Sequence, residues 1–173
     1  MRFNRPRLPA LFLLFAGLAW AQPVARVHHF HVLGDEAGAW PDVLCSIGLV
    51  AGQGGVYVVR SGEGAPGAQW FERAEQGAIV ILEGESEAAE MFGFKPGVKR
   101  VPVRNVEDVH APKLPIIWQK TLELPVWTVP EQARVFARER WTGAPLIAGF
   151  RKGAGAVLDR KSTRLNSSHV SQS

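Results

Sequence analysis

Cysteine is nearly absent from this sequence, since Cys45 is the only one in 173 residues. A single cysteine excludes an intramolecular disulfide framework and a zinc site built from several thiolates. We expect Cys45 to be a small, buried side chain within a helix. After residue 21 the sequence also lacks an apolar run long enough to cross a bilayer, and it has no internal repeats.

The first 21 residues have the three-part pattern of a secretory signal peptide. Three arginines precede a short apolar run at residues 10–20, and Ala19 and Ala21 form a small-x-small cleavage site. We therefore predict that residues 1–21 are removed on export and that the protein is secreted or periplasmic. An uncleaved membrane anchor is the alternative, although the run is short for a bilayer.

Residues 159–173 differ in composition from everything before them. Residues 159–169 resemble, at every position, the translation of a common sequencing adapter. We therefore predict that residues 159–173 are a non-native, disordered tail. Residues 22–158 would then form one α/β domain that is incomplete at its C-terminal end. A native serine-rich tail is the alternative.

The basic excess of the chain belongs to its two ends. Without the three arginines of residues 1–21, and the three basic and one acidic residues of 159–173, the 20 basic and 16 acidic residues fall to 14 and 15. No basic surface is left that would indicate binding to nucleic acid or to an anionic membrane. We expect neither as a partner after signal cleavage.

The first half of the chain alternates strand and helix patterns. Strand patterns lie at 27–33, 55–60 and 78–84, and helix patterns at 39–48, 67–77 and 86–93. The run at 78–84 is almost wholly apolar, which is typical of a strand buried on both faces of a parallel sheet. The alternation predicts right-handed crossovers in such a sheet.

The second half is richer in strand patterns, at residues 122–129, 133–141, 145–150 and 153–158. Gly143 and Gly153 mark turns between them. We therefore predict an α/β fold: a three-layer, flavodoxin-like parallel sheet in the first half, extended at its edge by antiparallel strands.

Polar residues follow each predicted parallel strand. They are Asp35 and Glu36 after the first strand, Arg60 and Ser61 at the end of the second, and Glu83 and Glu85 at the end of the third. Ligands of open α/β sheets bind outside the carboxyl ends of the strands. These six residues are therefore a candidate binding rim for a small molecule or a carbohydrate. Helix caps and solvated loop charges are the alternative interpretation.

Two segments, AIVILEGESEAAEMFGF (78–94) and GAPLIAGFRKGAGAVL (143–158), together with the strand order, resemble the class I glutamine amidotransferase-like superfamily. The resemblance covers residues 27–158 and implies a flavodoxin-like domain whose strand–elbow–helix presents a cysteine in a G-x-C-x-G motif. Here Ser86 replaces that cysteine and Ala88 replaces the last glycine. The resemblance therefore points to the non-catalytic members, which are accessory domains in secreted or carbohydrate-active proteins.

Three alternatives carry other chemistry. Ser86 with His110 and Asp108 would form a serine hydrolase site if the three side chains meet. His29 and His31, on one face of a strand, would hold a metal ion if an acidic residue completed the site. Three tryptophans of the second half would form a sugar-stacking platform if exposed on one face: Trp118, Trp127 and Trp141.

The sequence as a whole predicts an exported, non-catalytic α/β module, the N-terminal part of a larger protein. Its role would be binding or structural support linked to carbohydrate processing. We expect no cofactor and no resident metal.

Overall fold

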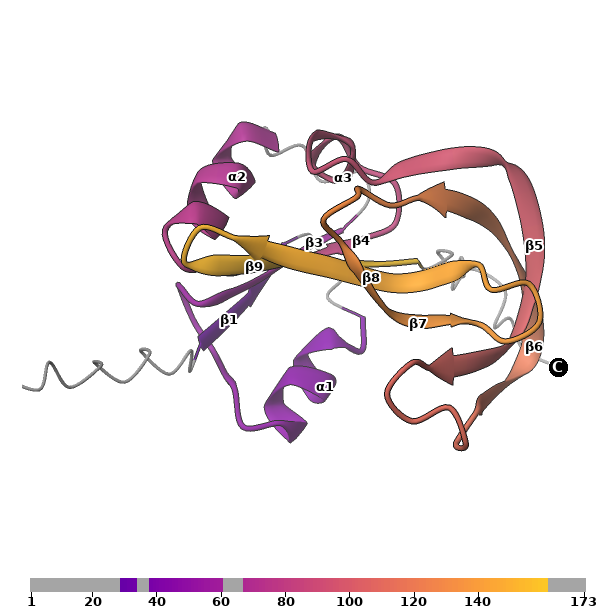
Figure 1. Ribbon diagram of the computed structural model, residues 1–173. Helices are drawn as coiled ribbons and strands as arrows, with labels where there is room; N and C mark the ends of the chain where they lie inside the picture. Colours follow the sequence, from indigo (N-terminus) through magenta and orange to yellow (C-terminus); the bar gives the residue numbers. More distant parts are fainter. Residues whose placement is uncertain (1–28, 34–37, 61–66, 162–173) are drawn as a thin grey trace, which may run out of the picture.

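The computed structural model describes residues 29–33, 38–60 and 67–161, and these form one mixed sheet with three helices (Figure 1). The helices are α1 (Trp40–Ser46), α2 (Gly67–Glu75) and α3 (Glu87–Met91). The strands are β1 (His29–Val32), β2 (Val50–Ala51), β3 (Val56–Arg60), β4 (Ile79–Glu83), β5 (Lys95–Asp108), β6 (Ile116–Thr128), β7 (Arg134–Glu139), β8 (Pro145–Lys152) and β9 (Gly155–Arg160).

The sheet has a parallel half and an antiparallel half. Its nine strands run in the order β2-β1-β3-β4-β9-β8-β7-β5-β6. The pairs β1–β2, β1–β3, β3–β4 and β4–β9 are parallel, and all the pairs from β9 to β6 are antiparallel. The predicted α/β class, with a parallel start followed by antiparallel strands, is confirmed.

The last strand lies in the middle of this sheet. β9 pairs in parallel with β4 on one side and antiparallel with β8 on the other. Adjacent patterns in the sequence had indicated a run of antiparallel strands that included residues 153–158. The structure corrects that view, because β9 returns to the parallel half and joins the two halves of the sheet.

Helices cover both faces of the parallel half. Along β3, Val56 and Val58 belong to an apolar cluster with Leu44 of α1. The intervening Tyr57 and Val59 belong to a second cluster with residues of α2 and α3. Because successive side chains of a strand point to opposite faces, α1 lies on one side of the sheet and α2 and α3 lie on the other (Figure 1).

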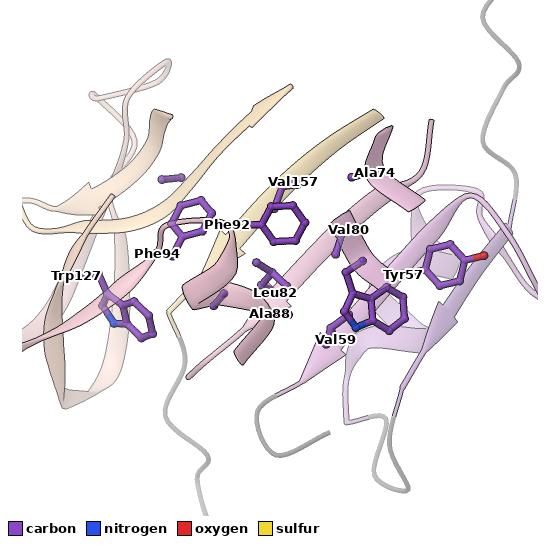
Figure 2. Close-up of a cluster of buried hydrophobic side chains, with 13 residues drawn as sticks. Tyr57, Val59, Ala74, Val80, Leu82, Ala88, Phe92, Phe94, Trp127 and Val157 are labelled. Carbon is purple, nitrogen blue, oxygen red and sulfur yellow. The ribbon is translucent and has the colours of Figure 1, made fainter. Parts of the chain in front are cut away.

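The larger core lies between the sheet and the helices α2 and α3. Figure 2 shows this cluster, with Leu82, Phe92 and Val157 near its middle and Trp127 and Tyr57 toward its two ends. Leu82 of β4 and Val157 of β9 are fully buried. Trp127 comes from β6, so the antiparallel half also contributes to this core.

α1 is less buried than its sequence predicts. Trp40, Val43, Leu44 and Ile47 lie at i, i+3, i+4 and i+7, a pattern typical of one buried helix face, yet Val43 and Ile47 are 48% and 69% exposed. Cys45 is exposed as well, so the prediction of a buried cysteine is wrong. The physical reason is that α1 turns only Leu44 fully onto the sheet, and Cys45 follows it around the helix on the solvent side.

The end of β9 carries charged side chains into the core. Val157 and Asp159 are both 0% exposed and Lys161 is 5% exposed. Neither carboxylate oxygen of Asp159 nor the amine of Lys161 has a hydrogen bond of normal geometry, although the two groups contact each other. The strand also extends to Arg160, two residues past the predicted domain end at 158. The foreign origin of residues 159–173 stays a prediction.

Within the described residues, none of the three helices has the length and apolar character that a bilayer crossing requires.

Burial has a measurable electrostatic consequence at Lys161. Its amine lies 3.1 Å from the centre of the Trp127 ring, and this desolvation lowers its pKa to about 6, partly offset by the charge of Glu85. In the unfolded chain the ordinary pKa is 10.5. Between these two values the unfolded state binds one more proton than the folded state.

We therefore predict that the protein becomes more stable as the pH rises from 6 to 9, by up to about 1.4 kcal/mol per pH unit from this group. Urea denaturation across that range measures the slope. The variant Lys161→Met should lose most of it, whereas Lys152→Met, which changes a partly exposed lysine, should keep it. Equal slopes in the wild type and Lys161→Met would contradict the prediction.

Candidate functional site

A polar cluster centred on Glu83 lies at the carboxyl edge of the parallel strands. Glu83 is the last residue of β4, and its side chain is 13% exposed. Its Oε2 accepts a hydrogen bond from Trp40 Nε1 at 2.8 Å and one from Arg60 Nε at 3.2 Å. Arg60 ends β3 in register with Glu83, so strand pairing itself brings the two side chains together.

The second oxygen of Glu83 is the open part of this cluster. In the described residues, Oε1 accepts no hydrogen bond, and its nearest cation is Arg160 Nη1 at 3.9 Å. Arg60 likewise uses only Nε in its contact with Glu83. An acceptor oxygen and terminal guanidinium donors therefore stand side by side at this edge.

Trp40 closes one side of the cluster. It is the first residue of α1, where a proline at the helix start fixes the entry of the chain. Arg160, at the end of β9, places its guanidinium carbon 5.2 Å from the centre of the Trp40 ring. The indole thus joins the ends of β4 and β9, because it donates to Glu83 and stacks with Arg160.

Three of the six predicted rim residues lie within the described part of the chain. Arg60 and Glu83 are in contact, while Glu85 is exposed and affects Lys161 through its charge. Asp35, Glu36 and Ser61 lie outside the described residues.

Ser86 serves as the N-cap of α3. Its backbone is extended, with φ −155° and ψ 154°, and its Oγ accepts a hydrogen bond from the backbone N–H of Ala89 at 3.1 Å. This geometry satisfies one of the free N–H groups at the helix start. The tight turn before it is made by Gly84, whose φ of 80° favours glycine.

His110 and Asp108 lie in a different part of the sheet. Asp108 ends β5 and His110 follows it, and β5 is separated from β4 by β9, β8 and β7. The His110 ring lies 6.3 Å from the ring of Phe136 in β7, and Asp108 accepts a hydrogen bond from the backbone N–H of His110 at 2.7 Å. The structure places neither side chain in contact with Ser86.

The histidines of β1 do not gather further metal ligands. His29 is exposed, and His31 packs edge-on against Tyr57 with ring centres 6.4 Å apart. Across residues 29–33, 38–60 and 67–161, no group of three or more His, Cys, Asp or Glu side chains is arranged to share a metal ion.

The three late tryptophans do not form one platform. Trp127 is 4% exposed and belongs to the main core, whereas Trp141 is 75% exposed. Trp118 packs against the cluster between β5 and β8. The platform hypothesis is therefore wrong, because the ring of Trp127 points inward beneath Lys161.

Sequence reasoning missed Trp40 and Arg160 as members of the edge cluster. Trp40 lies at an apolar position of a helix, which is typical of a core residue. Its position at the very start of a helix, beside a strand end, was the signal that could have marked it. Arg160 was placed in the tail, and only the pairing of β9 with β4 brings it to Glu83.

No family model matches the chain, and neither does any curated protein. Among solved structures, it is similar to the exo-β-1,4-mannosidase Op5Man5 from Opitutaceae bacterium strain TAV5, at 14% identity and TM-score 0.43, over 61% of this chain and 20% of the mannosidase. It is also similar to a β-galactosidase from Bacillus circulans sp. alkalophilus, at 13% identity and TM-score 0.42, over 61% of this chain and 20% of the galactosidase. The cytoplasmic protein STM1381 from Salmonella typhimurium LT2 is similar at 13% identity and TM-score 0.42, over 61% of this chain and 59% of the Salmonella protein. The chain thus spans about a fifth of each glycosidase.

We predict that Glu83→Ala destabilises the protein by about 1–3 kcal/mol, because it leaves the Trp40 N–H and the Arg60 guanidinium without their partner. Chemical denaturation followed by tryptophan fluorescence measures the loss. Glu85→Ala removes a carboxylate two residues away at an exposed position and should change stability by less than about 0.5 kcal/mol. Equal losses of stability in Glu83→Ala and Glu85→Ala would show that the hydrogen bonds of Glu83 contribute nothing to the free energy of unfolding.

A second prediction separates capping from nucleophilic chemistry at Ser86. Ser86→Ala should cost about 1 kcal/mol of stability, and Ser86→Asp, which keeps a capping oxygen, should restore most of it. Thermal denaturation compares the three proteins. A fluorophosphonate probe, which labels activated serines, should not modify the wild type. Labelling that disappears in Ser86→Ala would instead identify a nucleophile.

Proposed function

We propose that this chain is an exported, non-catalytic α/β module that binds a hydroxyl-rich ligand, by class a carbohydrate, at the carboxyl edge of its parallel strands. The observation that carries the proposal is the contact between Glu83 and Arg60, which uses only Oε2 of the carboxylate and Nε of the guanidinium. Among the described residues, Glu83 Oε1 accepts no hydrogen bond and the terminal nitrogens of Arg60 donate none. Adjacent sugar hydroxyls, each both donor and acceptor, complement such a pair.

Position in the fold supports this choice of site. The parallel strands lie in the order β2-β1-β3-β4-β9, which has the 2-1-3-4-5 pattern of flavodoxin-like sheets. In such sheets the ligand binds outside the carboxyl ends of the strands. We accordingly propose a three-layer, flavodoxin-like domain of amidotransferase-like type. The strand–turn–helix at residues 79–91 is consistent with that resemblance.

The proposal of a non-catalytic role rests on the state of Ser86. Its hydroxyl oxygen is used in capping α3, and its backbone is relaxed rather than held in a strained elbow. His110 and Asp108 form a turn at the end of β5. No contact among these three residues favours a hydrolase, so we carry that alternative no further.

We also propose that residues 159–173 are foreign to the natural protein, as the adapter resemblance implies, and Arg160 is therefore no part of the proposed ligand site. The inward positions of β9 are Gly155, Val157 and Asp159, and Lys161 follows them into the same core. A carboxylate and an amine without hydrogen bonds are costly at positions where apolar neighbours surround them. Export, the signal peptide and the place of this module at the start of a larger protein remain parts of the same proposal.

The binding proposal predicts a specific pattern of affinities. A glycan array followed by calorimetry should identify an oligosaccharide ligand of the mature chain. Glu83→Gln and Arg60→Met should each weaken its binding at least 10-fold, since each removes one charged hydrogen bond to the ligand. Glu85→Gln, the exposed neighbour, should bind like the wild type. Affinity unchanged in both Glu83→Gln and Arg60→Met would exclude this edge as the binding site.

A further inference from the structure

A groove of about 570 Å³ crosses three adjacent strands of the sheet, β7, β8 and β9 (Figure 1). Leu158 of β9 lines it and is registered with Ile81 of β4, which packs against the same apolar cluster as α1. The groove therefore opens on the face of the sheet that carries α1. Protein pockets that hold small molecules have volumes of about 300–1,000 Å³, so a small organic ligand has room here.

The groove lies farther along the sheet than the strands that α1 covers best. Leu44 of α1 packs with side chains of β3 and β4, and Trp40 reaches the end of β9. Leu158 and Phe136 line the groove, are partly buried, and belong to none of the three apolar clusters of the described residues. The groove thus offers apolar surface that a ligand can cover.

Strand register places the side chains of the groove in two rows across the sheet. In the first row, Arg134 of β7 pairs with Gly149 of β8, which pairs with Leu158 of β9. In the second row, two residues further along β8, Arg151 pairs with Ala156. The two arginines therefore project from the same face as diagonal neighbours, whose backbone positions are about 7–8 Å apart.

Gly149 forms the floor between Arg134 and Leu158. A Cβ atom at this position would collide with the carbonyl oxygen of Val157, and it would lie 3.2 Å from Leu158 Cγ. A larger residue would therefore displace the strand or fill the groove. The glycine leaves a flat apolar floor that can be reached from the side of the arginines.

The charged groups of the groove are hydrogen-bond donors. Within the described ranges, Arg134 and Arg151 form no ion pair, side-chain hydrogen bond or cation–π contact. Gln132 adds an amide, and no aspartate or glutamate of the described chain lines the groove. Two such guanidinium groups favour an oxyanion, which can accept two parallel hydrogen bonds from each.

We propose that this groove is a binding site for a small organic anion with a flat apolar body. Its carboxylate or phosphate group lies between Arg134 and Arg151 and accepts hydrogen bonds from both. Its apolar body covers the glycine floor, with Leu158 on one side and the ring of Phe136 on the other.

A neutral sugar fits this groove less well than an anion does. Sugar hydroxyl groups donate as well as accept, and among the lining side chains of the described residues only Gln132 provides an acceptor. The groove therefore differs in chemistry from the edge at Glu83, where a carboxylate is present. Binding of an anion here does not depend on the ligand site proposed at that edge.

Binding of 2-naphthoate and 2-naphthyl phosphate tests the proposal, with neutral 2-naphthalenemethanol as a control that has the same aromatic body. Isothermal titration calorimetry should show one site, with a Kd below about 1 mM for at least one of the two anions. The alcohol should bind at least about 10-fold more weakly, because it cannot pair with the guanidinium groups. Absence of binding by both anions, or equally tight binding of the alcohol, overturns the proposal.

Two variants locate the anion. Arg134→Met and Arg151→Met each keep a long apolar side chain and remove one guanidinium group. Each should weaken anion binding at least about 5-fold and leave binding of the alcohol unchanged. Arg104→Met removes an exposed arginine of β5 that does not line the groove, so it controls for the general loss of positive charge and should bind like the wild type.

A third variant changes the shape of the groove and keeps its charge. Ala156→Leu adds volume to the second row and should weaken binding of the anion and of the alcohol alike. Anion affinity that is unchanged in this variant and in both arginine variants would refute the proposed site. Anion affinity that falls as the protein concentration rises would also refute it, because a second copy of the chain would then occupy the groove.

Discussion

The pairing of β9 with β4 holds the two halves of this molecule together. β9 forms five registered parallel pairs with β4 and six antiparallel pairs with β8, so the sheet is continuous only through this strand. Close approach at its start requires glycine, because a side chain at Gly155 would collide with the carbonyl oxygens of Ala74 and Ala78. The strand thereby fixes the end of α2, the main core and the position of Arg160 beside Glu83.

Local patterns were enough to predict the elements of the parallel half. The unbroken apolar run of β4, the glycine after α2 and the serine before α3 each act within a few residues, so their effect can be read along the chain. The long β5–β6 hairpin was less visible, because prolines interrupt both strands. Pro102 is tolerated there since that part of β5 pairs with β6 alone, leaving no second ladder that needs its N–H.

The candidate site could be predicted only in part, because its contacts cross the sheet. Arg60 and Glu83 each end a strand, and parallel register alone brings such residues together. Trp40 lies 43 positions before Glu83 in the sequence, and Arg160 lies in the last strand. No local pattern indicates that either residue contacts Glu83. Conversely, Ser86 and His110 suggested a catalytic pair from residue type alone, yet one caps a helix and the other lies against Phe136.

The two misfits between this sequence and its fold lie on opposite faces of the same strand. Inward from β9, Asp159 and Lys161 occupy a core that Leu82, Phe94 and Trp127 make apolar. Outward, Leu158 faces a groove with apolar walls. A charged pair in a dry core and an apolar floor in solvent are both unfavourable, and β9 contributes both.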